Sequence, residues 1–263
     1  MELHGSWALV TGASSGIGAD IARELAARGM NLVLVARRQE RLDDLATELR
    51  REHGVQAEID ACDLSAPGVV AGLCERTEKR GRDIAVLVNN AGFGLHGDFI
   101  DQDIDRIGQM IQLNVVAATQ LTHWFGRAMV ARGGGYILQV ASIAGLNPLP
   151  TYAAYAATKA FLESLSGSIS HELGAKEVWV TALLPGTTWT EFFDHSGQKP
   201  TLHGRLTGMS SRDVARIGVK AMLGRRHSVI AGWRNWFSIM LAKLFPRHVR
   251  AWFIWQVNRN RRD

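Results

Sequence analysis

The sequence predicts a single α/β domain built on a doubly wound, seven-stranded parallel sheet, followed by an amphipathic helical tail. Short apolar runs alternate with amphipathic helical patterns along most of the 263 residues, as in a sheet covered by helices on both faces. The run at 84–88 is almost wholly apolar, as a strand buried on both faces must be. Glycine or polar residues follow most runs, at the end where parallel strands present ligand-binding residues. These three observations together favour a ligand-binding α/β fold.

The predicted domain spans residues 1–232 and contains the seven strands with about six helices between them. The strands are expected at 6–11, 31–36, 55–62, 84–88, 136–141, 178–184 and 228–231. The helices are expected after the first glycine turn as far as residue 28, and at 40–53, 69–80, 103–132, 151–173 and 211–223. Residues 191–210 hold several glycines, a proline and little periodicity, which predicts a mobile flap near the site.

The first strand leads through a glycine-rich turn at 11–18 directly into a helix. In that context Gly12 permits a tight turn, Gly16 lets the backbone approach a diphosphate, and Gly18 lets the helix pack on the strand. Free N–H groups at the helix start would face the anion. The turn therefore predicts a dinucleotide site of the Rossmann type. Its other expected cofactor contacts are Ser14, Ser15 and Ile17.

The second strand ends at Ala36 and is followed by Arg37 and Arg38. A site that prefers NAD carries an acidic residue near this place for the ribose 2′-hydroxyl, whereas a guanidinium pairs well with a phosphate. We therefore predict NADP(H) as the cofactor. The alternative is that both arginines merely begin a solvated helix.

Ser142 follows a predicted strand, and Tyr155 and Lys159 stand four residues apart in the next predicted helix. Residues four apart share a helix face, and a nearby cation favours phenolate and so lowers the pKa of a tyrosine. Such a tyrosine can exchange a proton near neutral pH, and the Ser142 hydroxyl can hydrogen-bond a substrate oxygen. Tyr152 has no lysine four residues on and is left out of the predicted site. The alternative for Tyr155 and Lys159 is an ordinary surface pair.

In order and spacing, these residues resemble the short-chain dehydrogenase/reductase family over roughly residues 5–224. The likeness is carried by 11–18, Asp63, 89–92, Asn114, Ser142, Tyr155 with Lys159, and Pro185 with Gly186. Within that family the pattern looks closest to the bacterial reductases called DltE-like. The resemblance implies an NADP(H)-dependent oxidoreductase that interconverts a carbonyl and a secondary alcohol, assembled as a homodimer or homotetramer. An NADP-binding sensor or scaffold without turnover is the alternative function.

The resemblance also implies a role for each catalytic residue. Tyr155 would give a proton to the carbonyl oxygen while NADPH supplies hydride, and Lys159 would lower the Tyr155 pKa and hold the nicotinamide ribose. Ser142 would orient the substrate oxygen, and Asn114 would hold a water that links Lys159 to solvent. Asn89 would tie strands together. The other implied cofactor contacts are Asp63 and Leu64 at the adenine, Asn90 at the ribose, Thr188 and Thr190 at the nicotinamide amide and diphosphate, and Gly92, Pro185 and Gly186.

Residues 233–263 form a basic, tryptophan-rich extension that the family pattern does not explain. Residues 225–263 hold nine Lys and Arg against one Asp, whereas residues 1–224 hold 21 against 24 acidic residues. Apolar residues at helical spacing run from Trp233 to the breaker Pro246, and a second stripe begins at Val249. Packing on the protein is favoured, as a roof over the substrate cleft, a cover for the body or a subunit contact. The open alternative is contact with an anionic membrane surface.

Other features limit the function further. The cysteines and histidines show no metal-ligand spacing, so no metal site is predicted. The aromatic residues of the tail follow a packing stripe rather than spaced stacking platforms, which argues against nucleic acid. Two free thiols and no secretion signal at 1–10 predict a cytoplasmic protein, peripheral to the inner face of a membrane if the tail binds lipid. The aromatic residues at 189, 192 and 193 favour a small apolar carbonyl or alcohol as substrate.

Overall fold

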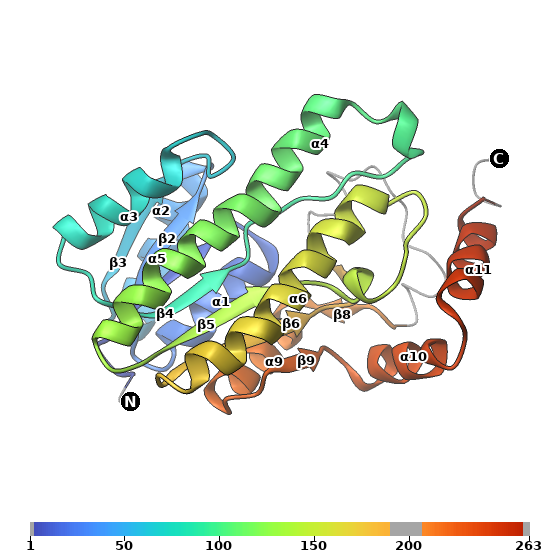
Figure 1. Ribbon diagram of the computed structural model, residues 1–263. Coiled ribbons are helices and arrows are strands. Elements are labelled where there is room, and N and C mark those ends of the chain that lie inside the picture. Colours follow the sequence, from blue (N-terminus) through green and yellow to red (C-terminus); the bar gives the residue numbers. More distant parts are fainter. Residues whose placement is uncertain (1–2, 190–206, 260–263) are drawn as a thin grey trace.

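The computed structural model describes residues 3–189 and 207–259, and it confirms the predicted α/β architecture (Figure 1). Seven parallel strands form one sheet in the order β3-β2-β1-β4-β5-β6-β9. The order reverses between β1 and β4, and at such a point an open sheet forms a ligand-binding crevice. The strands are β1 (Trp7–Thr11), β2 (Asn31–Ala36), β3 (Ala57–Ala61), β4 (Ile84–Asn89), β5 (Gly135–Val140), β6 (Val178–Leu184) and β9 (Ser228–Ile230).

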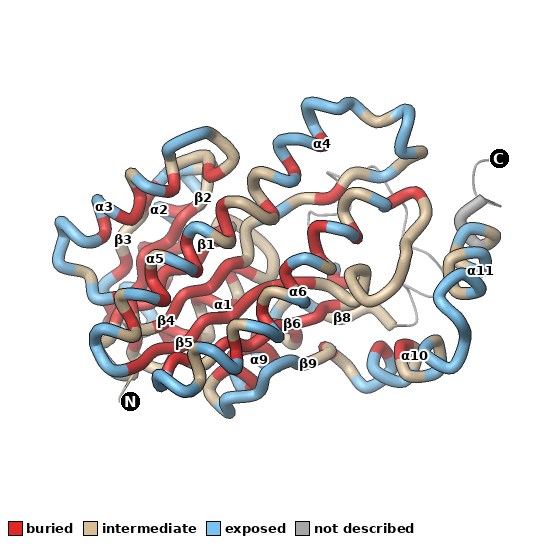
Figure 2. The backbone as a smooth tube through the Cα atoms, in the orientation of Figure 1, coloured by how far each residue is buried: buried red, intermediate tan, exposed pale blue. Residues whose placement is uncertain are grey.

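Helices cover both faces of this sheet and bury its apolar side chains. The helices α1 (Gly16–Ala26), α2 (Gln39–His53) and α9 (Ser211–Leu223) pack on one face. The helices α3 (Val69–Lys79), α5 (Ala118–Ala131) and α6 (Ala153–Gly174) pack on the other. Figure 2 shows the resulting core as a continuous buried layer along the central strands. All seven strands lie within two residues of their predicted limits.

The long helical segment predicted at 103–132 is continuous from 104 to 131, but it contains a π-helical stretch that the sequence did not predict. The helix α4 (Ile104–Ile111) passes into a π-helical segment, Gln112–Ala117, before α5 begins. A π turn is wider than an α turn and is frequent at functional sites. It was missed because the apolar periodicity of the sequence continues through it. The widened turn carries Asn114, which is completely buried.

The tail forms two helices, α10 (Trp233–Lys243) and α11 (Arg247–Arg259), with the break at Pro246 that the sequence predicts. In the part of the chain that the structure describes, no helix is both long and apolar enough to cross a membrane. Most of the predicted flap at 191–210 lies outside the described residues. Its last residues form β8 (Met209–Ser210), which pairs in parallel with β7 (Thr188–Trp189) in a separate two-stranded sheet.

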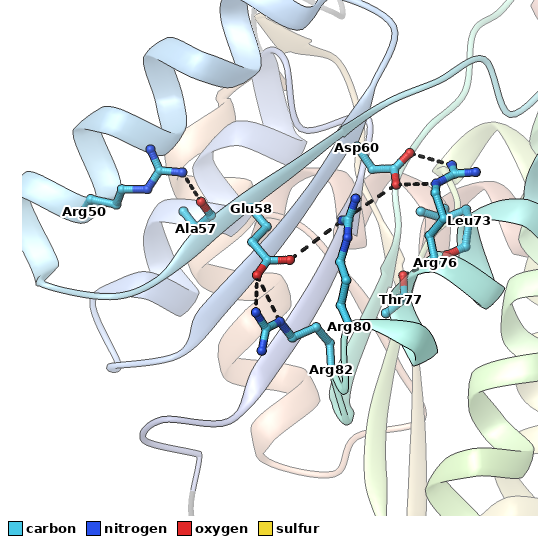
Figure 3. A network of polar contacts seen from close by, with 9 residues as sticks. All are labelled: Arg50, Ala57, Glu58, Asp60, Leu73, Arg76, Thr77, Arg80 and Arg82. Atoms are coloured by element: carbon cyan, nitrogen blue, oxygen red, sulfur yellow. Dashed lines mark hydrogen bonds and ion pairs between the residues drawn. The ribbon is translucent and has the colours of Figure 1, made fainter.

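The outermost strand β3 is tied to the end of α3 by a network of charged side chains (Figure 3). Asp60 accepts two hydrogen bonds from Arg76, at 2.9 and 2.7 Å. Arg80 lies 3.9 Å from Asp60 and 3.7 Å from Glu58, and Arg82 donates to Glu58 at 2.9 Å. The Asp60 carboxylate is buried, so the arginines satisfy a charge that the fold has removed from water.

Replacing Asp60 with asparagine is expected to destabilise the protein by about 1–2 kcal/mol, because a buried pair with Arg76 is broken while that half-exposed arginine can still reach water. Urea unfolding followed by tryptophan fluorescence measures the change. Asp83→Asn is the matched control: its side chain is 80% exposed and lies 3.4 Å from Arg132, so it should change stability by less than about 0.5 kcal/mol. Equal midpoints for the two variants would contradict the assignment.

Candidate active site

One cleft of about 870 Å³ collects most of the predicted site residues at the carboxyl ends of the strands. Gly18 and Asn114 lie behind its wall, and Thr190 falls outside the described residues. The predicted residues that line the cleft are Gly12, Ser14, Ser15, Gly16, Ile17, Arg37, Arg38, Asp63, Leu64, Asn90, Gly92, Ser142, Tyr155, Lys159, Pro185, Gly186 and Thr188. The fold therefore brings together residues that are far apart in the sequence.

The glycine turn is held too tightly for side chains at two of its positions. Gly12 has a φ of +66°, which L side chains rarely adopt, and a Cβ at Gly18 would stand 2.3 Å from the Gly12 carbonyl oxygen. The Asn90 amide donates to the carbonyls of Thr11 (2.9 Å) and Gly12 (3.2 Å), which fixes the turn from below. Ser15 precedes α1 without a side-chain cap, so the first N–H groups of the helix remain available to an anion.

A basic corner stands beside this turn. The Arg38 guanidinium donates to the hydroxyls of Ser14 (3.1 Å) and Ser15 (2.8 Å), which orients it toward the cleft wall. Burial would raise the pKa of the Asp63 carboxyl, but hydrogen bonds from Ser65 and the charge of Arg37 outweigh that effect and lower it. The corner therefore offers positive charge where a phosphate on the ribose would lie.

Ser142, Tyr155 and Lys159 meet in the same cleft. Ser142 follows β5 and precedes a short helix, Ile143–Leu146. Its hydroxyl accepts a hydrogen bond from the Ala144 N–H (3.1 Å) and donates one to the Pro185 carbonyl (3.4 Å). The same hydroxyl is hydrogen-bonded to Tyr155. One turn along α6, the Lys159 ammonium lies 5.9 Å from the centre of the Tyr155 ring and donates to the Val140 carbonyl (2.8 Å). All three side chains thus line the same cleft, with Ser142 hydrogen-bonded to Tyr155.

The electrostatics of this trio differ from the expectation drawn from the sequence. Burial raises the pKa of the Tyr155 phenol to about 12; the hydrogen bond with Ser142 opposes this shift, and Tyr152 adds to it. Burial also lowers the pKa of Lys159 to about 8. Lys159 is not among the causes of the Tyr155 shift, so the lowering of the Tyr155 pKa by Lys159 that the sequence suggested is not found.

Asn114 is fully engaged by the protein. Its side-chain oxygen accepts from the Phe93 N–H (3.1 Å), and its amide donates to the Phe93 carbonyl (2.9 Å) and to the Thr158 hydroxyl (3.1 Å). A Cβ at Gly92 would stand 2.8 Å from the Asn114 oxygen and 3.6 Å from the Lys159 nitrogen. Gly92 therefore keeps a narrow space open between those two side chains. The water that Asn114 was expected to hold between Lys159 and solvent stays a prediction.

Three other site details differ from the sequence-based expectation. Asn89 donates to the Thr122 hydroxyl (2.9 Å) and so ties β4 to α5 rather than to another strand. Asn90 makes the tie between neighbouring strands instead. Tyr152, which the sequence argument left out, lines the cleft with its ring centre 6.2 Å from that of Tyr155 and 4.9 Å from that of His96. The position of an aromatic residue three before Tyr155 was the sequence feature that could have added Tyr152 to the predicted site.

The tail also contributes to the cleft, which sequence reasoning had left as one of several possibilities. Asn235, at 1% exposure, packs against Gly186 and donates to the Ala231 carbonyl (2.8 Å), which fixes α10 below the turn after β6. The Arg250 guanidinium of α11 donates to the Asn147 side chain. The tail residues that line the cleft are Ser238, Ile239, Ala242, Phe253 and Ile254.

The chain is similar to known proteins over most of its length. A family model described as short chain dehydrogenase matches residues 6–201. The very-long-chain 3-oxoacyl-CoA reductase of Rattus norvegicus is 31% identical over 251 residues, 90% of this chain and 79% of the relative. The inactive hydroxysteroid dehydrogenase-like protein 1 of Homo sapiens is 30% identical over 264 residues, 100% of this chain and 79% of the relative.

Among solved structures, a short-chain dehydrogenase from Sphingobium yanoikuyae in complex with NADPH is 35% identical, with a TM-score of 0.82. The superposition covers 91% of this chain and 94% of that one. The likeness therefore extends over nearly the whole fold, and not only over the glycine turn.

Proposed function

The chain belongs to the short-chain dehydrogenase family of oxidoreductases, and from this we propose that it reduces a carbonyl to a secondary alcohol, or the reverse, with NADP(H) and with Tyr155 as acid and base. The observation that carries the proposal is the meeting of Ser142, Tyr155 and Lys159 in the cleft that also contains the glycine turn. One cleft therefore holds both the groups that can exchange a proton with a substrate and the turn that can bind the diphosphate of a dinucleotide.

The residues present fit NADP(H). The close contact between Gly12 and Gly18 leaves a side-chain-free floor, and the uncapped start of α1 supplies N–H groups for the diphosphate. Arg38, oriented by Ser14 and Ser15, and Arg37 would hold the phosphate on the ribose. The NADPH complex of the Sphingobium yanoikuyae relative supports the same assignment. When bound, the nicotinamide supplies or accepts the hydride.

The chain's own residues would handle the substrate oxygen and its proton. In carbonyl reduction Tyr155, whose phenol is held protonated by its surroundings, donates to the oxygen as negative charge develops there. Ser142 hydrogen-bonds the same oxygen and fixes its direction. Lys159, buried beside Tyr155, stabilises the phenolate that remains, and its low pKa of about 8 lets it exchange a proton in turn.

We propose an apolar substrate on the grounds of the cleft walls. Apart from the catalytic trio and the residues assigned to the cofactor, the cleft is lined mainly by aliphatic and aromatic side chains. Arg106 is the charged residue among them. The very-long-chain substrate named for the Rattus norvegicus relative supports this choice. The apolar walls are formed by Phe93, Leu95, Leu113, Leu149, Ile239 and Phe253.

We further propose a cytoplasmic homo-oligomer. Ile111 of α4 and Phe161 of α6 are 42% and 41% exposed on helices that pack against each other, which offers an apolar surface to a second copy. Burial raises the pKa of the thiols of Cys62 and Cys74 to about 12, so both side chains suit a reducing compartment as unreactive thiols.

A screen of ketones, aldehydes and diketones with NADPH tests the function. We expect loss of NADPH absorbance with at least one apolar ketone and much slower loss with NADH. Tight NADPH binding without turnover on any compound would support the second candidate, a sensor or scaffold. That candidate is favoured by one observation, the name of the inactive Homo sapiens relative.

A further inference from the structure

The apolar stripe of α10 faces away from the protein, contrary to the packing that its sequence favours. The inward face holds Asn235, Ser238, Ile239 and Ala242, which contact the cleft or the turn below it. The outward face consists of large apolar side chains three and four residues apart: Trp233 (73% exposed), Trp236 (52%), Phe237 (58%), Leu241 (50%) and Leu244 (77%). Amphipathic helices ordinarily bury their apolar side, whereas here a large apolar surface stays exposed against the described residues 3–189 and 207–259.

The helix α11 extends the same surface. Trp252 is 59% exposed and Phe253 63% exposed, and Phe245 lies between the two helices at 53%. Figure 2 shows α11 mostly in the colour of exposed residues, beside α10 at the same end of the molecule. We call the exposed apolar residues of α10 and α11 together the tail surface.

Positive charge borders the tail surface. Arg234, Lys243 and Arg247 are exposed on the same two helices. After Asp213 the chain contains no acidic residue until Asp263. Two copies of this surface placed face to face would bring like charges together, whereas an anionic bilayer complements both the charge and the apolar residues. Tryptophan, with an apolar ring and a polar N–H, suits the boundary between headgroups and acyl chains.

The tail surface adjoins the mouth of the cleft. Phe253 is 63% exposed and also lines the cleft, and its neighbour Ile254 lines it as well. The same two helices therefore present apolar groups outward to the surroundings and inward to the substrate. Among residues 233–256 of these helices, whose side chains are described, no charged residue lines the cleft.

We propose that α10 and α11 dock on an anionic lipid surface and set the mouth of the cleft against it, so that apolar carbonyl substrates enter from the bilayer. The docking stands on the tail surface and its charge. The entry route rests in addition on the function proposed above. The surface chemistry that is recognised is a mixed bilayer with anionic headgroups, not a particular lipid species.

Vesicle co-sedimentation with the full chain tests the docking. We expect the protein to bind vesicles of phosphatidylcholine with phosphatidylglycerol, to bind pure phosphatidylcholine weakly, and to leave the anionic vesicles at high salt because charges are then screened. The double variant W236S/W252S should bind the anionic vesicles at least about tenfold more weakly than wild type. The triple variant R234Q/K243Q/R247Q should lose about 100-fold in partitioning, since each basic group near the surface contributes about fivefold.

A matched control comes from a second exposed apolar site on the same protein. Ile100 and Ile104 are 90% and 72% exposed but stand among Asp101, Asp103 and Asp105. The variant I100S/I104S removes comparable apolar area from an acidic surface, so it should bind vesicles as the wild type does. NADPH binding by every variant confirms that it is folded.

The docking is overturned if wild type stays in solution with anionic vesicles, or if both tail variants bind as wild type does. A different result would show that a second copy covers the tail surface: wild type does not bind vesicles and is a dimer, and W236S/W252S is a monomer. Turnover of a short, water-soluble ketone without vesicles is measured in parallel. Turnover without vesicle binding refutes the docking alone, and vesicle binding without turnover refutes the proposed function and the entry route alone.

Discussion

Replacing Tyr155 with phenylalanine is expected to lower kcat for carbonyl reduction by about 1,000-fold while leaving the Kd for NADPH unchanged. The substitution removes the proton donor, and such a donor typically accelerates the reaction by about 100-fold to 10,000-fold. The ring itself stays, so its edge contact with Tyr152 at 6.2 Å is kept. Steady-state turnover gives kcat, and energy transfer from tryptophan to bound NADPH gives the Kd.

Tyr136→Phe is the matched control, because it removes the same atom near the amino end of β5, whereas the cleft lies at the carboxyl ends of the strands. Tyr136 is buried at 7% exposure and does not line the cleft. Turnover by this variant should be close to that of wild type. Near-normal turnover by the Tyr155 variant would instead show that the proton comes from another group, and the proposed mechanism would fail.

Replacing Arg37 and Arg38 together with alanine is expected to raise the Kd for NADPH by about 100-fold or more and to leave the Kd for NADH nearly unchanged. Hydrogen bonds to charged groups contribute about 1.5–3 kcal/mol each, and only NADPH carries the extra phosphate. Ser14 and Ser15 hold Arg38 in place before any ligand arrives, so little ordering cost offsets this contribution. Titrations with both cofactors measure the ratio directly.

Arg51→Ala serves as the comparison for this pair. Arg51 lies on α2, the helix that follows Arg38; its side chain is 72% exposed and contacts only Glu52 among the ion pairs of the described residues. Its loss should leave both cofactor affinities unchanged apart from a small effect of net charge. A parallel loss of NADH affinity in the Arg37/Arg38 variant would mean that the arginines shape the pocket rather than bind a phosphate.

The sequence was sufficient for the sheet because most strands are apolar and end at residues that stop them, while β3 alternates apolar and charged residues. β2 and β6 have the limits predicted for them. The π-helical segment at Gln112–Ala117 was not predicted, since one additional residue in a turn leaves no break in the apolar pattern. Helix periodicity thus identified the helices but not the widened turn that buries Asn114.

The site residues were predictable as a set but their electrostatics were not. Spacing along a helix places Lys159 beside Tyr155, yet only the fold shows how little water reaches them, and burial decides both pKa shifts. The tail illustrates the same limit. Its apolar stripe is plain in the sequence, but the direction in which the stripe faces depends on Asn235 beneath Gly186, a contact between distant parts of the chain.

The paired charges on β3 have a consequence for association between copies of the chain. An unpaired strand at the rim of a sheet invites another chain to add its own strand, and charged side chains there discourage it. On β3 that protection comes from Glu58 and Asp60 with their arginines, and at the opposite rim β9 has only three residues to offer. Intermolecular sheet extension and the aggregation that follows from it are therefore disfavoured at both rims, and oligomers of this protein should form through helices.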